Sequence, residues 1–159
     1  VRGIIMSDDY IHSLREAVGH QPIILNFAGG ILTNAQGDVL LQKRADFNAW
    51  GLPGGALELG ESQAEACQRE FKEETGLRVK VTQLLGSLSK ATQRYPNGDL
   101  AQTIVTMFKV EVVGGILEVA NAETADLAFF ALDDLPEIFN DQHQVVLTHY
   151  RKGQYPFYD

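Results

Sequence analysis

Three glutamates near the middle of the chain, Glu70, Glu73 and Glu74, have the spacing of side chains that share one face of a helix. Positions i, i+3 and i+4 lie within one turn, so we expect the three carboxylates to cluster. Like charges this close destabilise a helix by about 0.2–0.5 kcal/mol per pair unless a counterion neutralises them. A cluster of oxygen ligands favours Mg²⁺ or Mn²⁺ over zinc. Taken alone, the spacing is more typical of a solvated acidic helix face, so the neighbouring residues decide.

The segment in front of these glutamates favours a metal site. Gly54 and Gly55 allow a sharp backbone turn, which could bring a main-chain carbonyl oxygen to the carboxylates. Arg69 directly precedes the first glutamate and could hold a carboxylate through a bidentate contact. Residues 55–77 contain six acids and two bases, so this short segment carries half of the net charge of −8.

The same segment resembles the Nudix box, the 23-residue signature of the Nudix hydrolase family, at every defined position. The matching residues are Gly55, Glu61, Arg69, Glu70, Phe71, Glu73, Glu74, Gly76 and Leu77. The preceding residues 50–54, Trp-Gly-Leu-Pro-Gly, are also similar to the family. The resemblance implies an α+β fold, in which an α/β/α sandwich surrounds a mixed β-sheet. It also implies an enzyme that hydrolyses a nucleoside diphosphate linked to another moiety.

The resemblance carries roles onto individual residues. The implied metal ligands, for one to three Mg²⁺ or Mn²⁺ ions, are Glu70, Glu73, Glu74 and the carbonyl oxygen of Gly55. Glu61 is implied as a further ligand or as a support for the site, and Arg69 as the residue that orients the glutamates. A glutamate must accept the proton of the attacking water. Glu70 and Glu73 are the two candidates for this general base.

An acid from a later loop is a further candidate ligand or base. Glu123 is the first choice in the sequence Asn-Ala-Glu-Thr, and Asp126 is the second. A plain surface-loop acid explains either residue as well. Lys43 and Arg44 end an expected strand just before the site, and Arg44 is the better candidate for a substrate phosphate because strand alternation can aim it inward. A charge at a sheet edge is the alternative.

Three aromatic residues, Phe47, Trp50 and Tyr95, could stack on a nucleotide base, although packing in or beside the core is the commoner use. Tyr95 is similar in position to a tyrosine of the dinucleoside-polyphosphate subgroup. Pro96 falls too late to match the proline of the ADP-ribose subgroup. ADP-ribose, nucleotide sugars, dinucleoside polyphosphates and nucleoside triphosphates all remain candidate substrates.

Helix and strand signals alternate along the whole chain, with glycine-rich residues 46–60 expected to be mostly loop. Ser62 and Glu65 predict a capping box, and Gly76 predicts the end of that helix. Two turns are expected, at 34–37 and 95–98. The other expected helices cover 8–18 and 141–152. The expected strands cover 22–33, 38–44, 77–92, 100–113 and a stretch near 127–131.

Composition bounds the remaining possibilities. The 159 residues fit a single domain spanning 1–159, and 45% hydrophobic with 21% charged residues is typical of a globular protein. A net charge of −8 argues against nucleic-acid and membrane partners. The only cysteine, Cys67, excludes an internal disulfide and is expected in the core. We expect no signal peptide, a cytoplasmic location, and dispensable residues 1–5 if Met6 is the start.

Two functions from different classes fit this pattern. The first is a Mg²⁺-dependent hydrolase that acts on a nucleoside diphosphate derivative. The second is a sensor with the same fold that binds such a molecule without cleaving it. The chain keeps every glutamate of the box and has no basic region, which favours hydrolysis. A homodimer is possible, since dimers are common in the family and residues 8–19 offer an amphipathic surface.

Overall fold

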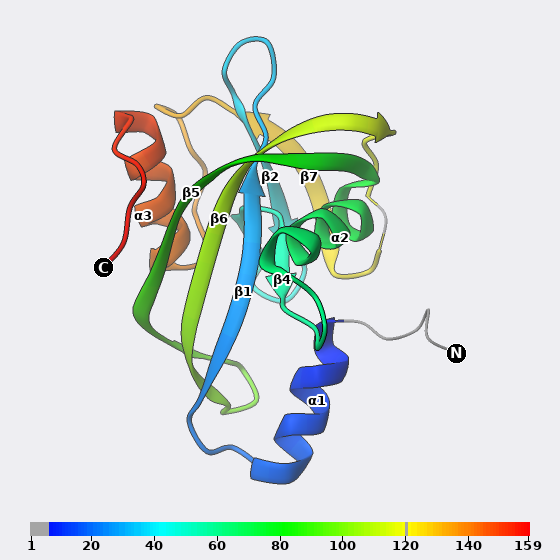
Figure 1. The fold of residues 1–159 in the computed structure, drawn as a ribbon, viewed down its shortest axis with the longest axis vertical. Helices are drawn as coiled ribbons and strands as arrows, with labels where there is room; N and C mark the ends of the chain where they lie inside the picture. The colour runs from blue at the N-terminus through cyan, green and yellow to red at the C-terminus, as the bar shows by residue number, and fades with distance from the viewer. Residues whose placement is uncertain (1–6, 120) are drawn as a thin grey trace.

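The computed structural model describes residues 7–119 and 121–159, and Figure 1 shows their arrangement. The expectation that residues 1–5 are dispensable concerns a segment outside this description. The helices are α1 (Ser7–Val18), α2 (Gln63–Thr75) and α3 (Asp141–Lys152). The strands are β1 (Ile23–Ile31), β2 (Val39–Arg44), β3 (Ala49–Gly51), β4 (Gly54–Ala56), β5 (Leu77–Arg94), β6 (Leu100–Gly115) and β7 (Thr124–Phe130). No helix in the described ranges combines the length and the apolar character needed to cross a membrane.

The strands form two sheets. One has the order β4-β1-β6-β5, in which β1 runs parallel to β6 and antiparallel to β4. The other has the order β3-β2-β7 and is antiparallel throughout. The turn at 34–37 forms as expected, with the Gly37 N–H donating to the Asn34 carbonyl at 3.0 Å. The strands on its two sides nevertheless belong to different sheets, so this turn carries the chain from one sheet to the other.

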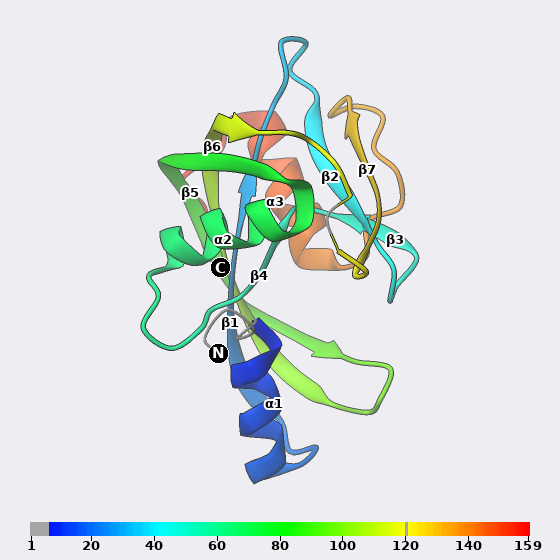
Figure 2. The same cartoon turned by 90° about the vertical axis from the view of Figure 1, so that its right-hand side faces the viewer.

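Helices α2 and α3 cover opposite sides of the sheet that contains β1, β6 and β5 (Figures 1 and 2). On one side, Cys67 and Phe71 of α2 pack with Val110 in one core cluster. On the other side, Val146 and Leu147 of α3 belong to a second cluster of buried apolar residues. These layers confirm the expected α+β sandwich around a mixed sheet, and they confirm Cys67 as a buried core residue.

Helix α2 follows its sequence signals closely. The Ser62 side chain accepts a hydrogen bond from the Glu65 N–H at 3.0 Å, and the Glu65 side chain accepts one from the Ser62 N–H at 2.8 Å. Gly76 ends the helix in the left-handed conformation with φ of 77°. Since Cys67 and Phe71 point into the core, the face that carries the acidic cluster is turned toward strands β4 and β1.

The strands differ from the expectations in two details. The glycine-rich segment 46–60 is mostly loop as expected, but it also contains the short strands β3 and β4, and β4 pairs with β1 through Ala28 and Gly55. Such three-residue strands have too few side chains to produce a period-2 pattern. Strand β7 begins at Thr124, three residues before the expected stretch, because the Thr124 hydroxyl donates to the buried Gln42 amide oxygen of β2 at 2.9 Å.

Helix α1 lies beside the turn end of the β5–β6 hairpin (Figure 2). The guanidinium of Arg15 fixes this arrangement by donating to the carbonyl oxygens of Gln21 at 2.6 Å and Leu100 at 2.7 Å. It also lies 3.4 Å from the carboxylate of Asp99. This anchoring brings the Ile11 and Arg15 side of α1 to the wall of a large cavity.

Candidate active site

A cavity of about 720 Å³ lies between α1, the two sheets and the start of α3. Its volume is within the range of small-molecule sites. The residues predicted from the sequence that line it are Gly55, Glu70, Glu74, Glu123, Arg44, Phe47 and Tyr95. Those outside its lining are Glu61, Arg69, Glu73 and Trp50. Residues far apart in the chain therefore meet around one space, and part of the acidic cluster faces it.

Glu70 is pressed against the backbone of β4. A Cβ atom on Gly55 would lie only 2.3 Å from Glu70 Oε2, so no other residue fits at position 55 without displacing this carboxylate. Only 3% of Glu70 is exposed. The predicted glycine–glutamate approach is therefore present in the geometry, and a main-chain segment lies directly beside a buried carboxylate.

Glu74 is the second buried carboxylate on the cavity wall. Its Oε1 accepts a hydrogen bond from the Gly54 N–H at 2.9 Å, and the Gln42 side chain also hydrogen-bonds to it. Burial, and next the negative charge of Glu70, raise the pKa of Glu74 well above its ordinary value. Two neighbouring buried carboxylates destabilise each other when both are ionised, so this part of the wall attracts a positive charge.

Arg69 supplies positive charge to the other side of the cluster. It makes a bidentate contact with Glu61, at 2.5 Å from Nε and 3.0 Å from Nη2, and it also contacts Glu70 at 3.0 Å and Glu73 at 3.3 Å. Burial alone would lower the pKa of Arg69, but the hydrogen bond to Glu61 and the three surrounding carboxylates raise it overall. The guanidinium thus holds three acidic side chains in fixed positions.

The contacts of Arg69 separate the roles of two acids. Glu61 binds Arg69 and accepts the Glu58 N–H at 2.9 Å, which favours the support role over the ligand role. Glu73 is the most accessible of the three helix glutamates, with 30% of its side chain exposed and only long contacts to Arg69. The loop that carries Glu123 is fastened nearby, because the Asn121 amide donates to the Glu73 carbonyl at 3.1 Å.

These oxygen donors fit a divalent cation. Glu70 and Glu74 are buried carboxylates beside β4, and carboxylate oxygens are hard donors. Mg²⁺ is commonly bound by one or two carboxylates together with water and substrate phosphate. Within 7–119 and 121–159, no three His, Cys, Asp or Glu side chains form a complete metal cluster. The protein therefore offers a partial set of ligands that water and phosphate oxygens would complete.

Arg44 and Tyr95 also line the cavity. Arg44 donates to both carboxylate oxygens of Asp46, at 3.0 and 2.8 Å. Its guanidinium also lies over the rings of Phe139 and Phe47, at 4.7 and 5.4 Å from their centroids. Arg44 therefore brings a fixed positive charge to a cavity that the carboxylates of Glu70 and Glu74 also line.

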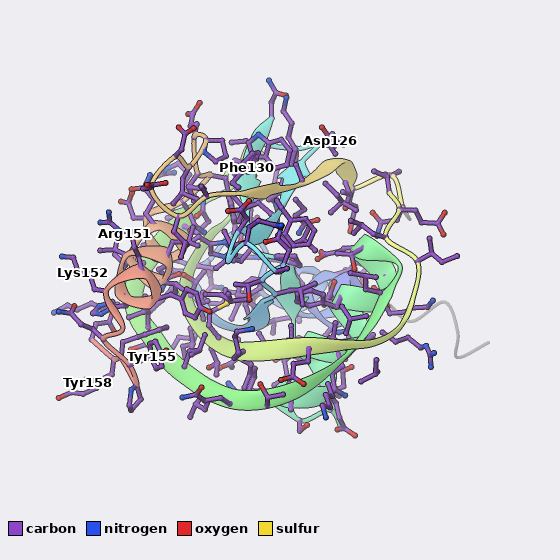
Figure 3. The ribbon with its side chains drawn as sticks, turned by 90° about the horizontal axis from the view of Figure 1, so that it is seen from above. Asp126, Phe130, Arg151, Lys152, Tyr155 and Tyr158 are labelled. Carbon is purple, nitrogen blue, oxygen red and sulfur yellow. The ribbon has the colours of Figure 1, made fainter. Side chains whose placement is uncertain are left out.

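Two further candidates lie elsewhere. Trp50 packs edge-on against Phe130, with ring centroids 4.8 Å apart at 81°, and it joins the core as the packing alternative expects. Asp126 is exposed on β7 and is not part of the cavity lining, whereas Glu123 is. Figure 3 shows Asp126 and Phe130 on β7, at the edge of the molecule.

Sequence reasoning missed His143, which lines the cavity from the first turn of α3. Its Nδ1 accepts the Leu52 N–H at 2.9 Å, and only 8% of the residue is exposed. Burial, and then the positive charge of Arg44, lower the pKa of His143 to about 3. The cap residue Asn140 predicts where α3 begins, but no signal in the local sequence indicates that the His143 ring reaches the cavity.

The depressed pKa of His143 predicts a contribution to acid unfolding. The unfolded chain takes up the imidazole proton near the ordinary pKa of 6.5, whereas the folded protein resists it down to about 3. This stabilisation is complete above pH 6.5 and is lost as the pH falls toward 3. Urea unfolding between pH 7.5 and 4 should therefore show a steeper loss of stability for wild type than for His143→Asn, which cannot titrate. Parallel pH dependences in the two proteins would contradict the burial argument.

Comparisons with known proteins agree with this geometry. The family model described as NUDIX domain matches residues 26–154. A relative from Methanocaldococcus jannaschii named ADP-ribose pyrophosphatase is 38% identical over 116 residues. The match covers 71% of this chain and 66% of the relative, which is just under two thirds of its length. A MutT-like protein from Streptomyces ambofaciens is 29% identical over 80% of this chain and 77% of its own length. The solved NUDIX hydrolase from Nitrosomonas europaea has a TM-score of 0.67 at 22% identity, covering 87% of this chain and 78% of that one, and therefore shares the fold.

Proposed function

The chain belongs to the NUDIX family of pyrophosphohydrolases, and on this basis we propose that it hydrolyses the diphosphate bond of a nucleoside diphosphate derivative with the help of a divalent metal ion. One observation carries the proposal. Glu70 and Glu74 are buried together against Gly54 and Gly55 of β4 and line a cavity that Arg44 also lines. This places carboxylates, a backbone segment and a guanidinium around a single space.

Each side chain has a role in the proposal. Glu70 and Glu74, with the carbonyl oxygen of Gly55, bind Mg²⁺ or Mn²⁺, and Glu73 completes the set from the more exposed side. A divalent ion held there would neutralise the diphosphate and activate a water molecule for attack on phosphorus. Arg69 fixes the carboxylates, as its contacts with Glu61, Glu70 and Glu73 indicate.

The proton of the attacking water needs an acceptor within hydrogen-bond reach. Of the two candidates, Glu70 lines the cavity and Glu73 does not. This difference supports Glu70 as the general base. Glu123 lines the same cavity from an exposed loop, which supports a role as a further ligand or as a second proton acceptor.

We propose ADP-ribose as the first substrate to test. Support comes from the name of the relative from M. jannaschii and from a cavity of about 720 Å³, which has room for a molecule of that size. Arg44, whose charge acts on Glu74, is proposed to contact a substrate phosphate beside the carboxylates. Nucleotide sugars, dinucleoside polyphosphates and nucleoside triphosphates belong in the same assay. The carboxylate cluster would recognise only the diphosphate, which all these substrates share.

The test is a hydrolysis assay of these four substrate classes with Mg²⁺, Mn²⁺ or excess EDTA, with products separated by anion-exchange chromatography. We expect turnover with either metal and a loss of about 100-fold or more in EDTA, because the charge of the diphosphate is then unneutralised. Full turnover in EDTA would overturn the metal-dependent mechanism. If ADP-ribose binds tightly but is not cleaved in the presence of either metal, the protein is a ligand sensor and not a hydrolase.

A further inference from the structure

One end of the cavity is aromatic. Phe47 and Phe139 lie with ring centroids 5.2 Å apart, and the His143 ring meets Phe139 edge-on at 4.8 Å and 75°. All three line the cavity. Arg44 lies over both phenylalanine rings, and its charge also acts on Glu74. Arg44 therefore stands between the aromatic end and the carboxylate end of the same space.

A glycine makes the aromatic end possible. A Cβ atom on Gly51 would lie 2.6 Å from the ring of Phe139 and 3.1 Å from Nδ1 of His143. Position 51 of β3 therefore has to be glycine, because any side chain there would push away Phe139, which precedes the N-cap of α3, and His143 in its first turn. The close fit gives Phe139 and His143 defined positions, as a recognition site needs.

The imidazole of His143 has one nitrogen engaged and one available. The Leu52 N–H donates to Nδ1, so the neutral ring carries its hydrogen on Nε2. Across residues 7–119 and 121–159, Nε2 has no hydrogen-bond partner, although the residue is more than nine-tenths buried. Nε2 is not itself sealed from solvent, in contrast to the buried and unpartnered Nδ1 of His149, and it belongs to a residue that lines the cavity. Its N–H is therefore open to a ligand in that cavity.

We propose that the Nε2–H of His143 hydrogen-bonds to an acceptor atom of the planar base of the substrate, seated at the aromatic end of the cavity. The acceptor is a ring nitrogen or a carbonyl oxygen of a nucleoside heterocycle. A neutral donor in aromatic surroundings suits an uncharged acceptor, whereas a phosphate suits Arg44 and the metal. This inference rests on the proposed function, since the nucleoside diphosphate supplies a base at one end and a diphosphate at the other.

The two nitrogens of His143 can be tested separately. In His143→Asn, the amide oxygen can replace Nδ1 as the acceptor for Leu52, but nothing reaches the position of Nε2. In His143→Gln, the longer amide can place an N–H near the position of Nε2, but the acceptor beside Leu52 is lost. The Asn variant therefore keeps the structural contact, and the Gln variant keeps the proposed contact with the ligand.

Calorimetric titration in EDTA would use AMP, GMP, CMP and UMP as probes, with ribose 5-phosphate as the probe without a base. We expect wild type to bind at least one mononucleotide more tightly than ribose 5-phosphate. His143→Asn should raise the Kd of that mononucleotide about 3- to 10-fold and leave the Kd of ribose 5-phosphate unchanged. His143→Gln should have the lower Tm of the two variants but the Kd closer to that of wild type.

Two results would overturn the inference. One is wild-type affinity of His143→Asn for every mononucleotide. The other is a larger rise in Kd for His143→Gln than for His143→Asn, because affinity would then follow the structural contact with Leu52. Neither measurement needs turnover. Mononucleotide binding that depends on His143 without any hydrolysis would refute only the proposed function, and hydrolysis with unchanged binding in His143→Asn would refute only this inference.

Discussion

Replacing Glu74 by glutamine is expected to reduce turnover by about two orders of magnitude or more without destabilising the metal-free protein. Glutamine keeps the shape of the side chain and an oxygen for the Gly54 N–H, which lies 2.9 Å from Glu74 Oε1. It removes a charge whose burial beside Glu70 is unfavourable, as the raised pKa of Glu74 indicates. The Tm of the metal-free variant should therefore equal or exceed that of wild type. Steady-state kinetics and thermal melts in EDTA measure the two effects.

Magnesium should distinguish wild type from this variant in the same melts. A ligand at 100 times its Kd stabilises the folded state by about 2.7 kcal/mol through mass action. Wild type should gain Tm on addition of Mg²⁺, and Glu74→Gln should gain less because it has lost a ligand. Glu73→Gln should lose activity to a similar degree. Its metal-free Tm should change little, since 30% of the Glu73 side chain is exposed and its contacts with Arg69 are long.

Glu65→Gln is the matched control. Glu65 is an exposed acid on the same helix, and glutamine can still close the capping box with Ser62. We expect wild-type turnover and a wild-type response to Mg²⁺ for this variant. Equal Mg²⁺ stabilisation of wild type, Glu73→Gln and Glu74→Gln, with activity retained, would show that the cluster is an ordinary acidic helix face.

The carboxylate end of the site was predictable because its determinants are local. Capping of α2 by Ser62 and Glu65 fixes where the helix begins, and helical periodicity then fixes which side chains share a face. The apolar stripe through Cys67 and Phe71 fixes which face is buried. The burial of Glu70 and Glu74 follows only from the approach of β4, whose three residues give no periodic signal.

Of the aromatic end, only Phe47 was a candidate from the sequence, because the residues of this end meet only in the folded chain. Phe47 follows β2, Gly51 ends β3, and His143 lies about ninety positions later on α3. Nothing in the local sequence distinguishes His143 from the other three histidines. The same limitation explains Trp50, which is next to Gly51 in the chain but packs against Phe130 in the core. Neighbouring residues of a strand point to opposite faces, so proximity in sequence does not put both at one cavity.

Arg69→Met is expected to destabilise the protein and to abolish most of its activity. The change removes one guanidinium from among Glu61, Glu70 and Glu73 and leaves three carboxylates close together. Breaking a fully buried ion pair costs about 3–5 kcal/mol, and the partial exposure of Arg69 and Glu73 reduces the expected loss to about 2–3 kcal/mol. Urea unfolding in EDTA measures this loss. Turnover should fall at least about tenfold even with saturating Mg²⁺, because carboxylates that have moved no longer hold the metal ion and the attacking water in the geometry that the reaction needs.

Arg69→Lys separates charge from geometry. Lysine restores the positive charge but cannot form the bidentate contact with Glu61, for which Nε and Nη2 of Arg69 are both needed. Stability should therefore recover in part while kcat remains low. Arg151→Met, an exposed arginine near the end of α3 (Figure 3), is the control and should match wild type in both measurements. If Arg69→Lys restores kcat completely, then the positive charge alone serves the site, and the bidentate contact with Glu61 has no part in positioning the glutamates.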